Sequence, residues 1–168
     1  MKKIIVIGCP GAGKSTLVFK LKDILNYPVL HLDKVYHITT DQHITRDELR
    51  AIVADFAKSS DKWIIDGNYI STVEERIKLA DTIIILDINT QICIQNVINR
   101  SKKEKTADMA AGFDNSKIKD GFLEFISKFK SETLPILMSY VEKYRNEKEF
   151  IIFHNYDEVN SFLANLNK

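Results

Sequence analysis

The sequence has few cysteines, almost no net charge and no long apolar run. Two cysteines, Cys9 and Cys93, are too few for a disulfide framework, so we expect reduced thiols. The 24 lysines and arginines against 23 aspartates and glutamates leave a net charge of +1, whereas general nucleic-acid binders are usually clearly basic. No apolar run approaches the roughly 18 residues of a membrane-spanning helix. We therefore expect neither a membrane partner nor a nucleic-acid partner.

The N-terminus superficially imitates a lipoprotein signal, because two lysines precede an apolar run that ends in Gly8 and Cys9. The run covers only residues 4–7, whereas the apolar core of a secretory signal needs roughly 7–15 residues. This difference, together with the low cysteine content, predicts a cytoplasmic protein that is not exported.

The apolar residues fall into short β-branched runs separated by longer segments of helical periodicity, a pattern typical of a parallel sheet with helices on both faces. The sequence shows neither an internal repeat nor a low-complexity linker. It therefore predicts a single α/β domain over 1–168 with a three-layer fold and a five-stranded parallel sheet. The five expected strands are 3–7, 29–32, 63–65, 82–86 and 150–153.

Capping residues mark several predicted helix starts. Thr45 with Glu48 and Ser71 with Glu74 each have the spacing of a capping box, and Asn89 can cap a helix that runs to about residue 100.

Two later segments break the alternation of strands and helices. Residues 101–116 are polar and contain few large apolar side chains, which favours a short mobile lid. Residues 117–146 form an amphipathic helical stretch that Pro135 should interrupt.

A phosphate-binding motif follows the first predicted strand. Residues 8–15 read Gly-Cys-Pro-Gly-Ala-Gly-Lys-Ser and match G-x-x-x-x-G-K-[ST], and a helical pattern begins at Thr16. Backbone N–H groups of such a loop surround phosphate oxygens, the lysine adds a positive charge, and the serine hydroxyl can bind magnesium. The residues predicted to hold ATP are Gly8, Pro10, Gly11, Ala12, Gly13, Lys14, Ser15 and Thr16.

Two carboxylates follow the second and third predicted strands. Because ligands collect at the carboxyl ends of parallel strands, Asp33 and Asp66 should lie near the phosphate loop. Asp66 suits magnesium binding together with Ser15, and Asp33 suits a base that orients an acceptor hydroxyl. Tyr36 and Tyr69 stand beside these acids and suit an aromatic wall for a small substrate, although core packing would also explain them.

These motifs together resemble the adenylate-kinase-related proteins known as DNA topology modulation proteins, or FlaR-like proteins. The resemblance extends over nearly the whole chain in order, and it rests on residues 8–16, the His-Leu-Asp-Lys-x-Tyr string at 31–36, the Trp-Ile-Ile-Asp-Gly-Asn-Tyr string at 63–69, Arg76 with residues 80–87, and the stretch 106–112. It implies a nucleoside-monophosphate-kinase fold with an ATP site and a lid. It also adds Asn68 to the expected substrate site.

Arginines are the expected partners of the transferred phosphoryl group. Arg100 ends the helix before the predicted lid and is the expected catalytic cation, whereas the lid itself carries lysines at 102, 103 and 105. Lysine keeps the charge but lacks the two-pronged geometry of arginine. Arg46 and Arg76 are candidates for an acceptor anion, although both could be ordinary surface arginines.

The sequence thus predicts a magnesium-dependent kinase that transfers the terminal phosphoryl group of ATP to a small acceptor. Lys14, Asp33 and Arg100 are the expected catalytic residues, and Ser15 and Asp66 the expected metal ligands. The alternative is a nucleotide-dependent regulatory or DNA-associated module without productive transfer, which the family name suggests.

Overall fold

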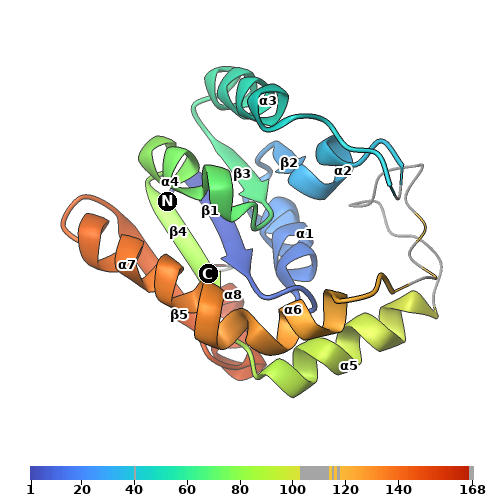
Figure 1. Cartoon of the computed structure of the whole chain (residues 1–168). Coiled ribbons are helices and arrows are strands. Elements are labelled where there is room, and N and C mark those ends of the chain that lie inside the picture. The colour runs from blue at the N-terminus through green and yellow to red at the C-terminus, as the bar shows by residue number, and fades with distance from the viewer. Residues whose placement is uncertain (40, 103–113, 115, 117, 167–168) are drawn as a thin grey trace.

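The protein is described from a computed structural model, which covers residues 1–39, 41–102, 114, 116 and 118–166. Its five strands form one parallel sheet in the order β2-β3-β1-β4-β5 (Figure 1). The strands are β1 (Lys3–Gly8), β2 (Val29–His31), β3 (Trp63–Asp66), β4 (Thr82–Leu86) and β5 (Glu149–Phe153). The predicted α/β class and five-stranded parallel sheet are confirmed, and each strand lies within one residue of its predicted bounds.

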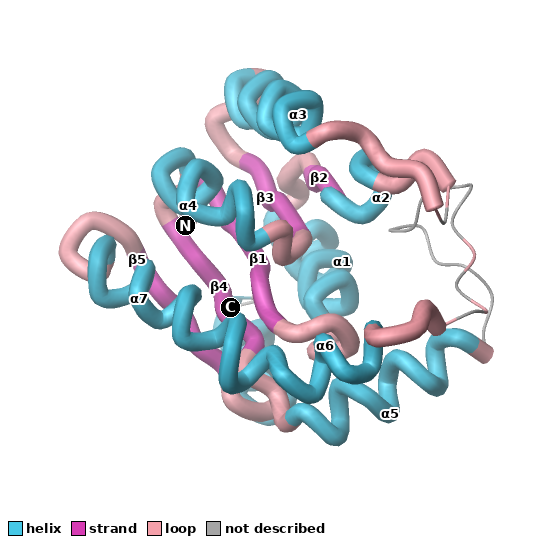
Figure 2. The backbone as a smooth tube through the Cα atoms, viewed as in Figure 1, coloured by secondary structure: helices cyan, strands magenta, loops and turns pink. Residues whose placement is uncertain are grey.

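Helices cover both faces of this sheet. They are α1 (Lys14–Leu25), α2 (Leu32–Tyr36), α3 (Arg46–Lys58), α4 (Ile70–Leu79), α5 (Thr90–Ser101), α6 (Phe122–Lys128), α7 (Leu134–Tyr144) and α8 (Tyr156–Leu166), with a π-helical turn, η1 (Phe129–Thr133), before α7. Helices α4 and α7 lie on one face, and α1 and α8 lie on the other (Figures 1 and 2). The described residues therefore form the three layers that the alternating pattern predicts.

The core lies in the sheet because its central strands are covered on both faces. Residues 4–7 of β1 have no exposed surface, and β3 and β4 are buried along their whole length. This explains why these strands are runs of isoleucine and valine instead of alternating apolar and polar residues. Because parallel strands end at the same edge, β1, β2 and β3 bring the phosphate loop, Asp33 and Asp66 to one side of the molecule.

The predicted helix caps are partly confirmed. Thr45 and Glu48 form both hydrogen bonds of a capping box at the start of α3, and the side chain of Asn89 accepts a hydrogen bond from the backbone N–H of Gln91. The box at Ser71 and Glu74 is wrong: α4 begins after Tyr69, whose backbone is left-handed, and no side chain caps it.

The predicted interruption near Pro135 is found one turn earlier, where η1 separates α6 from α7. Pro135 is the second residue of α7 and comes directly after this turn, in which the Leu134 N–H bonds to the Phe129 carbonyl, five residues back. Among the described residues, none of the helices combines the length and apolar character that crossing a membrane requires. The predicted lid at 101–116 lies mostly outside the described residues.

Candidate functional site

The phosphate loop joins the end of β1 to the start of α1. Gly11 and Gly13 both have left-handed φ angles, of 83° and 88°, which let the chain turn sharply before Lys14. Gly11 also packs against helix α5 so closely that a Cβ atom there would collide with the backbone carbonyl of Cys93. The two free cysteines, both buried, lie at this contact, Cys9 in the loop and Cys93 in α5.

We expect Gly11→Ala to destabilise the protein by about 2 kcal/mol or more, because left-handed strain costs about 1–2 kcal/mol and overpacking against backbone adds about 1–3 kcal/mol. Urea denaturation measures the change. The matched control is Gly121→Ala, since Gly121 has a similar φ of 75° but no atom within 4 Å of the added Cβ position. Equal losses in the two variants would contradict the close packing of the loop on α5.

Lys14 and Ser15 face the expected position of the phosphates. The Lys14 Nζ atom donates a hydrogen bond of 3.1 Å to the Cys9 carbonyl across the loop. The Ser15 hydroxyl donates to Asp66 Oδ2 at 2.9 Å, which joins the start of α1 to the end of β3. His31 Nδ1 contacts the same carboxylate oxygen at 3.0 Å, and sequence reasoning gave His31 no role.

The Ser15 and Asp66 side chains fit a magnesium ion. They offer a hydroxyl and a carboxylate in direct contact, and magnesium prefers such oxygen ligands. Within the described ranges, no cluster of three or more histidine, cysteine, aspartate or glutamate side chains could hold a metal ion. Magnesium is usually bound through one or two protein oxygens together with substrate phosphates and water.

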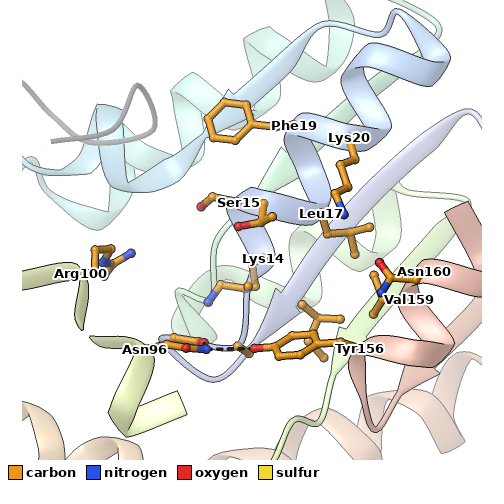
Figure 3. A pocket seen from close by; sticks show the side chains of 15 residues that line it. Lys14, Ser15, Leu17, Phe19, Lys20, Asn96, Arg100, Tyr156, Val159 and Asn160 are labelled. Carbon is orange, nitrogen blue, oxygen red and sulfur yellow. Dashed lines mark hydrogen bonds between the residues drawn. The ribbon is translucent and has the colours of Figure 1, made fainter. Parts of the chain in front are cut away.

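A pocket of about 550 Å³ lies over the phosphate loop (Figure 3). It is lined by Gly11, Ala12, Gly13, Lys14, Ser15, Thr16, Leu17, Phe19, Lys20, Leu86, Asn96, Arg100, Tyr156, Val159 and Asn160. Six of the eight predicted ATP-binding residues are in this lining, and Gly8 and Pro10 lie in the preceding part of the loop. Arg100, predicted as the catalytic cation, also lines the pocket.

Asn96 and Tyr156 fasten the loop to α5 and α8. The side-chain amide of Asn96 donates to the Gly11 carbonyl at 2.9 Å and to the Tyr156 hydroxyl at 3.0 Å. The Tyr156 ring lies beside Gly13, which has no side chain to displace it. Sequence reasoning missed both residues. One available signal was the position of Asn96 one helical turn before Arg100, which puts the two on the same face of α5.

The ends of β2 and β3 carry a second cluster of polar and aromatic groups. The Tyr69 hydroxyl donates to Asp33 Oδ1 at 2.7 Å. Burial and the neighbouring Asp33 carboxylate raise the pKa of Tyr69, so the hydroxyl stays protonated. The Tyr36 ring packs at centroid distances of 4.7 Å from Tyr69 and 4.8 Å from His43. The three residues predicted for an acceptor here, Asp33, Tyr36 and Tyr69, are therefore brought together.

Arg76, predicted to bind an acceptor anion, is instead bonded to the backbone. Its side chain has no exposed surface, and its guanidinium donates to the backbone carbonyls of Gly67, Asn68 and Tyr69. Burial lowers its pKa to about 10, which leaves it charged at neutral pH. Arg76 thus supports the loop after β3 from within, because the carbonyls of that loop need buried hydrogen-bond donors.

The loop after β3 contacts both the phosphate loop and Asp33. The Asn68 side-chain oxygen accepts a hydrogen bond of 2.9 Å from the Gly8 N–H, at the start of the phosphate loop. The Tyr69 hydroxyl of the same loop donates to Asp33. Asn68, predicted as a substrate ligand, therefore braces the phosphate loop. Arg46 is exposed at the first residue of α3.

We expect Arg76→Met to lower the free energy of unfolding, because each buried carbonyl left without its donor costs about 1–3 kcal/mol. Thermal and urea denaturation measure the loss. Arg76→Lys should lose less, because an ammonium group can still reach one of the carbonyls. The control is Arg50→Met, which removes a partly exposed arginine that binds Asp47 and Glu75. A loss at Arg76 no larger than at Arg50 would contradict the supporting role.

The chain resembles solved structures but matches no family model and no curated sequence. Among solved structures, shikimate kinase from Acinetobacter baumannii in complex with shikimate is similar, with a TM-score of 0.64, 15% identity, and coverage of 99% of this chain and 90% of that one. Deoxyadenosine kinase from M. mycoides with bound dATP has a TM-score of 0.55, 16% identity and full coverage of both chains.

At sequence identities of 15% and 16%, these similarities show that the fold is shared and nothing more. The chain has the α/β fold of P-loop kinases, with a phosphate loop between its first strand and first helix. The structural neighbours are a nucleoside kinase and a shikimate kinase.

Proposed function

We propose that the protein is a magnesium-dependent phosphotransferase that moves the terminal phosphoryl group of ATP to a small hydroxyl-bearing acceptor. The observation that supports this most is the pairing of two sites at one edge of the sheet. Ser15 and Asp66 meet beside the phosphate loop, and Asp33 and Tyr69 meet at the ends of the neighbouring strands. A protein that only binds nucleotide has no need for the second pair.

On the ATP side, the phosphate loop and Lys14 hold the phosphates, and Ser15 and Asp66 hold magnesium. When bound, the metal neutralises charge on the terminal phosphates. Arg100 lies across the pocket from α1 (Figure 3), where its guanidinium can approach the phosphoryl group in transit. Tyr156 and Asn96 border the same pocket and bind the nucleoside portion in this proposal.

On the acceptor side, Asp33 orients the acceptor hydroxyl and accepts its proton. The hydroxyl oxygen forms a bond to the terminal phosphorus as the bond between that phosphorus and ADP breaks. Tyr69 holds the Asp33 carboxylate in place through its 2.7 Å hydrogen bond. Positioning of the two reactants and stabilisation of charge account for the catalysis in such reactions.

The proposal also includes a lid, formed by residues 101–116, over the phosphates. The 168 residues form a single domain. The protein works in the cytoplasm and has no nucleic-acid partner. Membership of the topology modulation proteins rests on the strings at 8–16, 31–36 and 63–69. We favour transfer over the regulatory alternative because Asp66 and Asp33 each belong to a separate hydrogen-bonded pair at the same edge of the sheet.

The experiment that tests the proposal measures ADP formation from magnesium-ATP in the presence of nucleosides, nucleoside monophosphates and small hydroxy acids. We expect at least one acceptor to raise the rate well above ATP hydrolysis in water, and removal of magnesium by a chelator to abolish the increase. If ATP binds but no acceptor raises the rate, the regulatory alternative replaces the kinase.

A further inference from the structure

The acceptor side is fixed by secondary structure next to the phosphate site. His31 pairs in register with Asp66 across β2 and β3, and its ring contacts the Asp66 carboxylate at 3.0 Å. Helix α2 starts at the next residue and carries Asp33 in its first turn. Asp33 therefore follows His31, the partner of Asp66, by two residues at the same edge of the sheet.

Aromatic rings form the surface next to Asp33. We call the rings of Tyr36, His37, His43 and Tyr69 the aromatic wall. Tyr36 lies at its centre and packs on the other three at centroid distances of 5.1 Å (His37), 4.8 Å (His43) and 4.7 Å (Tyr69). His43 is stacked on Tyr36 with an interplanar angle of 10°.

Backbone hydrogen bonds hold this wall in place. An antiparallel bridge pairs His37 with His43, and the Ile44 N–H donates to the Tyr36 carbonyl at 3.0 Å. The bridged segment thus holds the rings of Tyr36, His37 and His43, and the loop after β3 holds the ring of Tyr69. Preorganised aromatic surfaces of this kind bind planar rings by stacking, with little loss of side-chain freedom.

Three positively charged side chains on this side of the sheet bond to other groups. Arg76 is buried and bonds to three carbonyls. Arg50 bonds to Asp47 and Glu75, and Lys119 pairs with Asp41 at 3.2 Å. Burial lowers the pKa of His37, which favours its neutral form. The charged group that contacts the wall is the Asp33 carboxylate, which accepts the 2.7 Å hydrogen bond from Tyr69, and like charge would repel an acceptor phosphate or carboxylate placed beside it.

We infer that the acceptor is an uncharged nucleoside, whose base lies against the aromatic wall and whose sugar hydroxyl is oriented by Asp33. This inference rests on the proposed function and narrows it to one substrate class. The hydroxyl oxygen bonds to the terminal phosphorus of ATP, the bond from that phosphorus to ADP breaks, and the hydroxyl proton passes to Asp33. The products are a nucleoside monophosphate and ADP.

The test compares matched acceptors that differ in one phosphate: adenosine with AMP, deoxycytidine with dCMP, and thymidine with dTMP, with shikimate as a carboxylate-bearing acceptor. ADP formation and the mass of the product are measured with magnesium-ATP. We expect one or more nucleosides to be used with kcat/KM at least tenfold above that of the matching monophosphate and of shikimate. A preference for a monophosphate or for shikimate overturns the inference but leaves the kinase in place.

Absence of transfer to every acceptor, with magnesium-ATP binding intact, overturns the proposed transferase itself and this inference with it. Two wall variants complete the test. Tyr36→Ala should raise the nucleoside KM about tenfold, as loss of a stacking partner does. His43→Ala should raise it less and is safe for folding, because His43 is exposed.

The control for the wall variants is Tyr27→Ala. Tyr27 lies before β2, at the end of that strand opposite Asp33, where it bonds to the Met1 carbonyl. Nucleotide binding by calorimetry shows which variants are folded. If both wall variants keep the nucleoside KM of the Tyr27 variant, the base does not lie on the wall, and the inference is wrong.

Discussion

Lys14→Ala is expected to weaken ATP binding about 10- to 100-fold and to lower acceptor-dependent turnover by a further 100- to 1,000-fold. The first figure reflects the loss of a charge-assisted hydrogen bond, which contributes about 1.5–3 kcal/mol. The second reflects the loss of a fixed positive charge where negative charge moves during transfer. Calorimetry with magnesium-ATP and a steady-state assay measure the two effects separately.

The fold of this variant should be unchanged, because the Lys14 side chain points into the pocket and its hydrogen bond is to the loop itself. Circular dichroism and thermal denaturation check this point. Lys22→Ala is the matched control, since Lys22 lies in the last turn of the same helix and outside the pocket lining. Unchanged affinity in the Lys14 variant would refute the assignment of the loop as the phosphate site.

Asp33→Asn should lower acceptor-dependent turnover about 100- to 10,000-fold, the range that general bases commonly contribute. Asparagine keeps the shape of the side chain and can still accept the Tyr69 hydrogen bond, but it cannot take the acceptor proton. Binding of magnesium-ATP should stay almost unchanged, because Asp33 lies outside the pocket lining. The measurements are kcat with a verified acceptor and calorimetry with magnesium-ATP.

Two further variants show whether this effect is specific. Tyr69→Phe removes only the hydroxyl that holds Asp33 and should reduce turnover less than Asp33→Asn. Asp66→Asn should impair the magnesium-dependent part of ATP binding, which Asp33→Asn spares. Turnover of a verified acceptor at the wild-type rate by Asp33→Asn would show that Asp33 is not the base.

The parts of the fold that could be predicted are those set by local pattern. Strands β1, β3 and β4 are buried on both faces, so their continuous apolar runs identify them directly. The phosphate loop is equally local, since its glycines and Lys14 follow one another in the chain. Asp33 and Tyr69 could be placed together because each follows the end of a parallel strand.

What could not be predicted depends on partners far apart in the sequence. Glu74 has the spacing for a box with Ser71, but it binds Lys143 and Tyr144 instead, 69 and 70 residues away, and these bonds lower its pKa to about 2. Asn96 meets Tyr156 across 60 residues.

Arg76 is a candidate anion ligand in the sequence because it comes soon after the Asp-Gly-Asn-Tyr string at 66–69, which follows a strand end. Its role is decided by the loop carbonyls that surround it. A local sequence pattern does not indicate how a loop folds over a side chain. The burial of Arg76 is therefore evident only from the three-dimensional structure.

In the proposed reaction, the terminal phosphoryl group leaves ATP for a second molecule. The most direct measurement follows that group itself: ATP labelled in its terminal phosphate is incubated with magnesium and an acceptor, and the labelled products are separated. We expect label on the acceptor in amounts equal to the ADP formed, and none when magnesium is removed. Label that stays on ATP or appears only as inorganic phosphate, with every acceptor offered, would contradict it.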